Sequence, residues 1–314
     1  MIDALCRLDA AKWDTGLSPA NARACWAGAL STLGAEGRPR VDRGRAPRAV
    51  GLIASANVFT APLEWLVQLA ARGVPTLLKP ARGQTGMAEA WAGCIPGMSV
   101  RPWRGGELDP EAEFLAEVDG VIAFGRRETL DAIGARVPPG VVYIPFGPRY
   151  GVSVVDEIGA DTVLDHALYD GRGCMSPAAV FARRVNLADI GNRMEAAETQ
   201  LPRGRVEPAD AAAIRARVAL GKAVGRVEEG AHWAVIELPI RYFSPIALPR
   251  VLNVHPFADL EEVRAAVEPT GALLGTVAGE GLDATRVCAP GRMQFPEVGR
   301  AHDGVDVLAA LWRR

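Results

Sequence analysis

The chain has 314 residues, of which 49% are hydrophobic and 23% are charged, with 34 glycines and 23 prolines. These values are ordinary for a globular protein and exclude a mainly disordered chain, and the length predicts about two domains at roughly 150 residues each. The formal net charge of −2 excludes the basic surface that nonspecific binding to nucleic acids or anionic membranes requires. We therefore expect a small molecule or a protein as the partner.

The N-terminal sequence and the cysteines indicate where the protein works. Residues 1–9 lack a basic stretch followed by an uncharged apolar one, and no apolar run reaches the roughly 18 residues of a membrane span. We therefore expect a cytoplasmic protein. The chain has five cysteines: Cys6, Cys25, Cys94, Cys174 and Cys288. Their odd number and wide spacing predict neither a disulfide framework nor a structural zinc site, so a functional cysteine is expected to act singly, as a nucleophile.

In the first half of the chain, apolar runs alternate with amphipathic segments. Residues 34–48 are basic and glycine-rich without apolar periodicity, and we interpret them as a solvated connector. The expected strands are residues 49–54, 76–78, 120–124 and 141–144. The expected helices run from near residue 62 to just before Gly73, from residue 85 to residue 94 and from residue 128 to residue 136. This alternation predicts parallel βαβ units, whose ligands bind beyond the carboxyl ends of the strands.

The second half has a looser rhythm of the same two patterns. The expected helices are residues 156–168, 187–201, 209–224 and 260–267. The expected strands are residues 179–182, 233–238, 251–254 and 272–277. We therefore predict an α/β protein with an N-terminal segment and Rossmann-like cofactor-binding domain over residues 1–155, followed by a second α/β domain with a C-terminal tail over residues 156–314, which holds the candidate nucleophile.

Small, flexible residues surround Cys174 in the segment 171–177 (GRGCMSP). The thiol is therefore expected on a turn whose backbone N–H groups are free to point at a substrate oxygen. Such donors, together with Arg172, lower the pKa of a cysteine and favour a reactive thiolate. The alternative for this segment alone is a buried, inert cysteine.

Polar side chains follow the first two expected strands. Asn57 lies just past strand 49–54, where its amide can donate to a developing oxyanion. Lys79 ends the second strand and Arg82 follows shortly after it, where a nucleotide ribose or phosphate lies in a βαβ fold. An arginine there can pair bidentately with a phosphate. The plain alternatives are a turn-forming asparagine and solvated charges.

With these residues in this order, the chain resembles the aldehyde dehydrogenase superfamily. The resemblance is strongest to its bioluminescence-type branch, the fatty acyl-CoA reductases that supply aldehyde to luciferase. The motifs that carry it are residues 77–80 (LLKP), 123–129 (AFGRRET), 167–177 (ALYDGRGCMSP), 243–250 (FSPIALPR), 291–294 (GRMQ) and 302–304 (HDG). The resemblance implies an aldehyde dehydrogenase-like fold with a Rossmann-like parallel sheet for the cofactor and a second, catalytic α/β domain.

The resemblance implies NAD(P)H-dependent reduction of an acyl thioester to an aldehyde, with acyl-CoA or an acyl-carrier protein as the donor. Cys174 is then the nucleophile, Asn57 and the Cys174 backbone N–H form the oxyanion hole, and Lys79 binds the cofactor. Further cofactor contacts are expected at Arg82, Gly125, Thr129 and Phe243. Pairing of Arg82 with a 2′-phosphate would favour NADPH over NADH. No metal is expected.

His166 and the departures from the family leave alternatives open. His166 lies at the end of an expected helix before Cys174 and is a candidate for lowering the Cys174 pKa or relaying a proton, although a plain helix-end histidine is the alternative. Residues 144–148 (IPFGP) hold no acidic residue in place of the Glu-Leu-Gly-Gly segment of aldehyde-oxidising relatives, which favours transfer between thiols over hydrolysis. Arg241 stands two residues before Phe243, where those relatives hold the nicotinamide ribose with a glutamate.

Two other functions remain in view. One is an acylating aldehyde dehydrogenase acting on a short-chain substrate. The other is a non-catalytic homologue that binds an acyl-carrier partner. Two features favour this second alternative: the Arg241 departure, and a chain that is short for the family at its N-terminal end. A homo-oligomer is a further open alternative.

Overall fold

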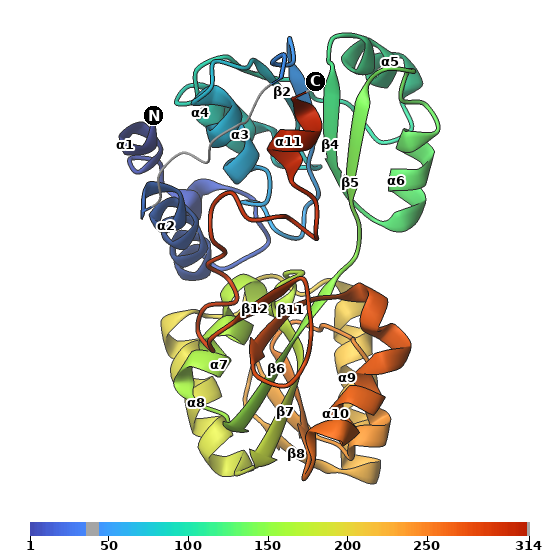
Figure 1. The fold of residues 1–314 in the computed structure, drawn as a ribbon. Helices are drawn as coiled ribbons and strands as arrows, with labels where there is room; N and C mark the ends of the chain where they lie inside the picture. Colours follow the sequence, from blue (N-terminus) through green and yellow to red (C-terminus); the bar gives the residue numbers. More distant parts are fainter. Residues whose placement is uncertain (36–43, 313–314) are drawn as a thin grey trace. The chain divides into compact units, whose positions relative to one another are not determined.

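The computed structural model describes residues 1–35 and 44–312, which form two compact α/β units, each built around one sheet (Figure 1). Unit 1 comprises residues 1–15, 26–148 and 297–314, and unit 2 comprises residues 16–25 and 149–296. The expected domain boundary at residue 155 falls inside a strand, β6 (Tyr150–Glu157), of unit 2. Most of the expected connector, residues 36–43, lies outside the described residues.

Unit 1 contains a parallel sheet of five strands in the order β3-β2-β1-β4-β5. The strands are β1 (Val50–Ile53), β2 (Thr76–Lys79), β3 (Met98–Val100), β4 (Gly120–Phe124) and β5 (Val142–Phe146). All four residues of β1 are buried, which is why this strand reads as a continuous apolar run. The order of the strands reverses between β1 and β4. The carboxyl ends of these two strands therefore form the switch point at which α/β proteins bind ligands.

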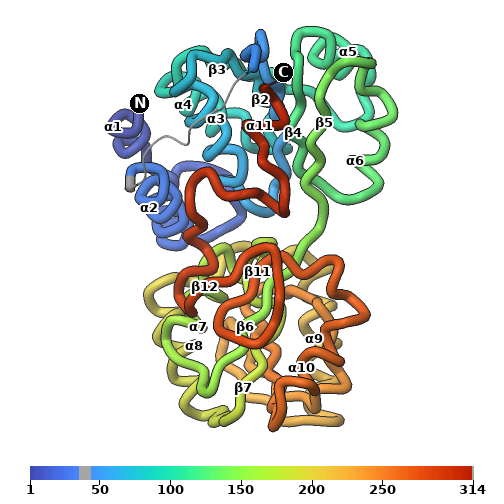
Figure 2. Tube along the Cα trace, viewed as in Figure 1, coloured from blue at the N-terminus to red at the C-terminus, as the bar shows by residue number. Residues whose placement is uncertain are grey.

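Short helices precede, connect and follow the strands of unit 1. They are α1 (Ile2–Leu5), α3 (Leu63–Ala70), α4 (Thr85–Ala92), α5 (Leu108–Ala116), α6 (Arg127–Gly134) and α11 (Val307–Leu311), with a 3₁₀ turn η1 (Ala10–Lys12). The α5 side chain Phe114 packs onto Gly51 of β1, where a Cβ atom would lie 2.6 Å from the ring, so this contact requires glycine. The helix α11, red in Figure 2, lies near the C-terminal end of the chain. Its Leu311 side chain packs onto Gly120 of β4.

Unit 2 contains a sheet of seven strands in the order β12-β11-β6-β7-β10-β9-β8, in which only β8 is antiparallel to its neighbour. Besides β6, the strands are β7 (Pro177–Arg184), β8 (Arg226–Glu229), β9 (Ala234–Glu237), β10 (Val251–Pro256), β11 (Leu274–Gly279) and β12 (Arg286–Cys288). The helices are α7 (Ala160–Ala167), α8 (Leu187–Gln200), α9 (Pro208–Val224) and α10 (Leu260–Val267), with 3₁₀ turns η2 (Leu168–Gly171), η3 (Ile240–Tyr242) and η4 (Glu268–Leu273). The helix α2 (Pro19–Ala35) contributes residues to both units.

One departure from the predicted elements is at β6. Residues 156 and 157, predicted to open a helix, are the last two of this strand, and α7 begins only at Ala160. The first five residues of β6 are all buried between β11 and β7, so the strand shows no alternation of polar and apolar residues. In the described part of the chain, no helix combines the length and the apolar character needed to cross a membrane.

Candidate active site

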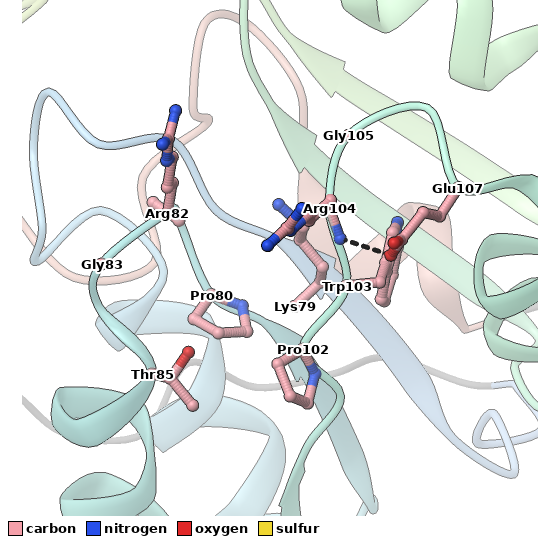
Figure 3. A pocket seen from close by; sticks show the side chains of 11 residues that line it. Lys79, Pro80, Arg82, Gly83, Thr85, Pro102, Trp103, Arg104, Gly105 and Glu107 are labelled. Atoms are coloured by element: carbon pink, nitrogen blue, oxygen red, sulfur yellow. Dashed lines mark hydrogen bonds between the residues drawn. The ribbon is translucent and has the colours of Figure 1, made fainter.

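A pocket of about 740 Å³ lies at the carboxyl ends of β2 and β3 in unit 1 (Figure 3). One wall is the loop after β2, residues 79–85, and the other is the loop after β3, residues 102–107. Parallel neighbours end at the same edge of a sheet, which brings these loops together. Three cationic side chains line the pocket: Lys79, Arg82 and Arg104. The pocket is therefore suited to an anion.

The three cations are held in different ways. The Lys79 Nζ atom lies 5.8 Å from the ring centroid of Trp103. Burial lowers the pKa of Lys79, and the negative charge of Glu111 partly offsets this effect by raising it. Arg82 and Arg104 are exposed, and Figure 3 shows Arg82 on the loop after β2 and Arg104 on the loop after β3. The Arg104 backbone N–H donates to Glu107 Oε2 at 2.8 Å. A bound anion would favour the charged form of Lys79, which burial disfavours.

The residues of this pocket fit the adenosine end of a nicotinamide cofactor. The pocket lies at the ends of β2 and β3, and β2 is the neighbour of β1, the strand that borders the switch point. Two guanidinium groups there can pair with the oxygens of a ribose phosphate. Lys79 and Arg82, both predicted from the sequence, are brought together here. Arg104 was not predicted, because β3 has only three residues and its short apolar run gave no sign that residues 102–107 follow a strand.

Three other predicted residues lie at the same edge of the unit 1 sheet but do not line this pocket. Asn57 is exposed in a bend after β1. Gly125 follows β4 directly, and its N–H donates to the Phe146 carbonyl at 3.2 Å. Thr129 is exposed in the first turn of α6. Because β1 and β4 are adjacent and parallel, these three residues border the switch point.

Cys174 lies in unit 2, in the loop between η2 and the amino end of β7, and it is exposed. The Ser176 N–H donates to the Gly173 carbonyl at 2.9 Å and closes a turn around the cysteine. Ser176 Oγ accepts from Gln294 Nε2 at 2.8 Å, and the same amide nitrogen donates to the Asp165 carbonyl at 3.1 Å. The structure therefore excludes the alternative of a buried cysteine.

His166 and Phe243 are also in unit 2, and both contribute to packing. The His166 side chain is 1% exposed, and burial lowers its pKa to about 3, so the ring is neutral at neutral pH. It lies under Gly171, whose φ of +71° suits glycine and whose Cβ, if present, would lie 2.8 Å from the ring. A neutral ring supplies no charge to lower the Cys174 pKa, which favours packing over the predicted charged role.

Phe243 follows η3 and packs in an aromatic cluster of unit 2. Its ring centroid lies 5.3 Å from that of Phe181, 5.9 Å from that of His255 and 6.2 Å from that of Tyr150. The Arg241 guanidinium lies 4.9 Å from the ring centroid of Tyr242.

Among the residues that the structure describes, no group of His, Cys, Asp or Glu side chains is arranged to hold a metal ion.

Sequence comparison decides the family. Residues 92–314 match the acyl-CoA reductase (LuxC) family. The chain belongs to this acyl-CoA reductase family. It is 26% identical over 244 residues to the long-chain acyl-protein thioester reductase of Aliivibrio fischeri, a match that covers 69% of this chain and 50% of that protein. The chain thus spans about half the length of this curated relative.

Solved structures confirm the predicted aldehyde dehydrogenase-like fold. A lactaldehyde dehydrogenase matches with a TM-score of 0.65 and 15% identity, covering 99% of this chain and 80% of that one. An NAD-dependent benzaldehyde dehydrogenase from Corynebacterium glutamicum matches with a TM-score of 0.62 and 15% identity, covering 95% of this chain and 79% of that one. The family match confirms the predicted branch, the bioluminescence-type fatty acyl-CoA reductases.

Proposed function

We propose that this chain reduces an acyl thioester to an aldehyde with NADPH or NADH, through an acyl group carried on Cys174. The observation that carries the proposal is the exposure of Cys174 on a loop closed by the Ser176–Gly173 hydrogen bond. Membership of the acyl-CoA reductase family supports the reaction. The name of the Aliivibrio fischeri relative, a reductase of acyl-protein thioesters, supports an acyl-carrier protein beside acyl-CoA as the donor.

The first step is acyl transfer to Cys174. Its thiolate attacks the thioester carbonyl carbon, a new C–S bond forms as the bond to the donor sulfur breaks, and the donor leaves as a thiol after taking a proton. One thioester replaces another, so the exchange is nearly isoenergetic and needs no activated water. The absence of an acidic residue in 144–148 agrees with this chemistry.

The second step releases the aldehyde. Reduction needs a hydride at the acyl carbon, which is the chemistry that a reduced nicotinamide supplies when it is bound. The C–S bond of the resulting thiohemiacetal on Cys174 then breaks. This step releases the aldehyde and regenerates the free Cys174 thiol. In both steps negative charge develops on the acyl oxygen, and we assign its stabilisation to the Cys174 N–H and to the Asn57 amide, which follows β1 at the switch point.

We infer that NADPH is preferred to NADH. Lys79, Arg82 and Arg104 give the pocket three cationic groups against one carboxylate, that of Glu107. A ribose hydroxyl does not need this excess of positive charge, whereas a 2′-phosphate is recognised by it. Gly125 and Thr129, beside the switch point, are proposed to contact the remainder of the cofactor.

The test is acylation in the absence of reductant. The wild-type chain is incubated with short-, medium- and long-chain acyl-CoAs and with an acyl-carrier protein thioester, and the adduct is located by intact mass and peptide mapping. We expect one acyl group on Cys174, absent from Cys174→Ala and retained in Cys6→Ser, which removes the other exposed cysteine. Subsequent addition of NADPH should release the acyl group as aldehyde.

Each other outcome favours a defined alternative. An acyl group on Cys6, Cys25, Cys94 or Cys288 contradicts the mechanism. Adducts formed with short-chain donors alone favour an acylating aldehyde dehydrogenase. No adduct with any donor contradicts catalysis through Cys174 and favours a non-catalytic homologue that binds an acyl-carrier partner.

A further inference from the structure

We propose that the buried ion pair between Arg250 and Asp170 positions the Cys174 loop, so that Arg250 is a positioning residue for acyl transfer. This inference rests on the proposed function of Cys174. It concerns unit 2 alone, because both members of the pair and the loop belong to that unit.

The backbone just before the loop is strained. Tyr169 has φ 55° and Asp170 has φ 54°, and Gly171 follows with φ 71°. Residues with a Cβ atom rarely adopt this left-handed conformation, and it persists only where the surroundings hold it in place. Both non-glycine side chains are buried, Asp170 completely. This turn carries the chain from α7 to Cys174, so whatever holds the turn also places the cysteine.

The Asp170 carboxylate is held from three directions. Its Oδ1 accepts from Arg250 Nε at 3.0 Å and from Asn21 Nδ2 at 3.1 Å, and its Oδ2 accepts from the Gly204 backbone N–H at 3.0 Å. The Arg250 N–H also donates to the Asp170 carbonyl at 3.3 Å. These donors come from α2, from the loop after α8 and from the residue before β10. The strained turn is thus tied to three separate parts of unit 2.

Arg250 is itself fixed by more than Asp170. Its side chain is fully buried, its Nη2 donates to the Leu201 carbonyl, and its Nη1 lies 3.7 Å from Glu198 Oε2. Because Nε and Nη2 donate to two different acceptors, Asp170 and the Leu201 carbonyl, the orientation of the planar guanidinium is fixed. It therefore links the turn rigidly to the end of α8 and to β10.

Asn21 supplies a second, uncharged tether to the same turn. Its Oδ1 accepts from the Tyr169 N–H at 3.3 Å, and its Nδ2 donates to the Ala167 carbonyl at 2.9 Å. Beyond the cysteine, the Gln294 amide holds Ser176, and a Cβ atom on Gly151 would lie 2.9 Å from the Met175 carbonyl oxygen. The cysteine loop is therefore short and fixed at both ends. Misplacing a nucleophile by about 1 Å can cost on the order of a hundredfold in rate.

The test compares Arg250→Lys with Arg217→Lys. Lysine keeps the charge of Arg250 but lacks the planar set of donors that reaches both Asp170 and Leu201. Arg217 is a matched control, because it is also a buried arginine of unit 2, and its Nε donates to Asn253 Oδ1 at 2.7 Å. Single-turnover acylation is measured without reductant, together with amide hydrogen exchange of residues 168–175.

We expect the limiting acylation rate of Arg250→Lys to fall about tenfold to a hundredfold, with the half-saturating donor concentration changed less than about threefold. Exchange of residues 168–175 should accelerate in this variant only, and Arg217→Lys should acylate within about threefold of wild type. If Arg250→Lys does not fold, Asn21→Ala provides the same two readouts without an unpaired charge, and its acylation should also slow.

Two results would count against the proposal, and they differ from failure of the proposed function. A folded Arg250→Lys that acylates as fast as Arg217→Lys overturns the positioning role. A slower Arg250→Lys whose 168–175 amides exchange at the wild-type rate overturns the link through the turn. A wild-type chain that takes no acyl group on Cys174 instead defeats the proposed function itself.

Discussion

The pocket of unit 1 and the Cys174 loop of unit 2 both lie beside parallel strands, but they are built in opposite ways. Arg82 and Arg104 extend from exposed loops and hold two of the three positive charges of the pocket at the surface. The turn before Cys174 is buried, strained and tied by a charge pair with no exposure at either side chain. One site presents charge on adaptable side chains, and the other fixes a backbone.

This difference matches two tasks. A cofactor that binds and leaves in every cycle is recognised well by charge, because electrostatic attraction tolerates small errors of position. A nucleophile that forms a covalent bond needs a defined approach to the carbonyl carbon, because alignment contributes directly to the rate. We therefore expect substitutions in the unit 1 pocket to change cofactor affinity and selectivity, and substitutions around the Cys174 turn to change the rate of chemistry.

Asn57 is the expected exception to this division between binding in unit 1 and chemistry in unit 2. It belongs to unit 1, but we expect it to change the rate of the chemical step. Loss of one oxyanion donor costs about 10²–10³ in kcat, so Asn57→Ala should lower kcat by that factor with little change in KM for the acyl donor. Ser55→Ala, in the same segment after β1, is the matched control and should stay within about twofold of wild type. A variant in which only KM rises would make Asn57 a turn residue and leave the division intact.

Substitutions in the cationic pocket of unit 1 test whether this unit determines cofactor selectivity. Arg104→Ala and Arg82→Ala should each lower the NADPH-to-NADH ratio of kcat/KM by about tenfold, because a charge-assisted contact to phosphate contributes about 1.5 kcal/mol or more. NADH kinetics should change little. Arg101→Ala is the control: this exposed arginine follows β3, pairs with Glu117 at 3.2 Å and does not line the pocket. A wild-type ratio near one would remove the 2′-phosphate from the proposal.

The same contrast explains what the sequence predicted and what it did not. Strands 49–54 and 120–124 were found because central strands of a parallel sheet are buried on both faces and read as apolar runs. The edge strand β8 (RVEE) has mostly exposed side chains and shows no such run. Lys79 and Arg82 could be placed because they directly follow a recognisable strand.

The tethers of the Cys174 loop could not be read from local patterns. Asp170 and Arg250 are 80 residues apart, and Asn21 and Asp170 are 149 apart. Hydropathy patterns report which side chains are buried, not which buried charges pair across such distances. The one local signal was Gly171 after the Tyr-Asp pair, since a glycine there permits a left-handed turn.

The smallest expected effect concerns three histidines whose protonation opposes folding. His302 of unit 1 is partly buried, and His166 and His255 of unit 2 are buried. In unit 1 the His302 ring centroid lies 4.1 Å from that of Phe146 and 5.9 Å from that of Trp65, and burial lowers its pKa to about 3, assisted by Arg300. In unit 2 burial lowers the pKa of His166 to about 3 and that of His255 to about 4. Each folded-state pKa is below the unfolded value of about 6.5.

The sign of the pH dependence follows from these values. Between pH 6.5 and 3 the unfolded chain binds a proton at His302 that the folded chain does not, so the free energy of unfolding falls as the pH decreases through this window and is fully present above pH 6.5. One such group contributes at most about 1.4 kcal/mol per pH unit. His302→Phe keeps an aromatic ring in the cluster and removes the titration.

We therefore expect His302→Phe to lose about 1–2 kcal/mol less stability than wild type between pH 7.5 and pH 5, measured by urea unfolding. The exposed His232, changed to Phe, is the control and should follow the wild-type curve. Because unit 2 keeps two buried histidines, the variant should still weaken in acid, and the residual slope then belongs to unit 2. An unchanged slope in His302→Phe would show that His302 is already neutral in the unfolded ensemble or protonated in the folded one, and it would leave the acid sensitivity of the protein entirely to His166, His255 and the carboxylates.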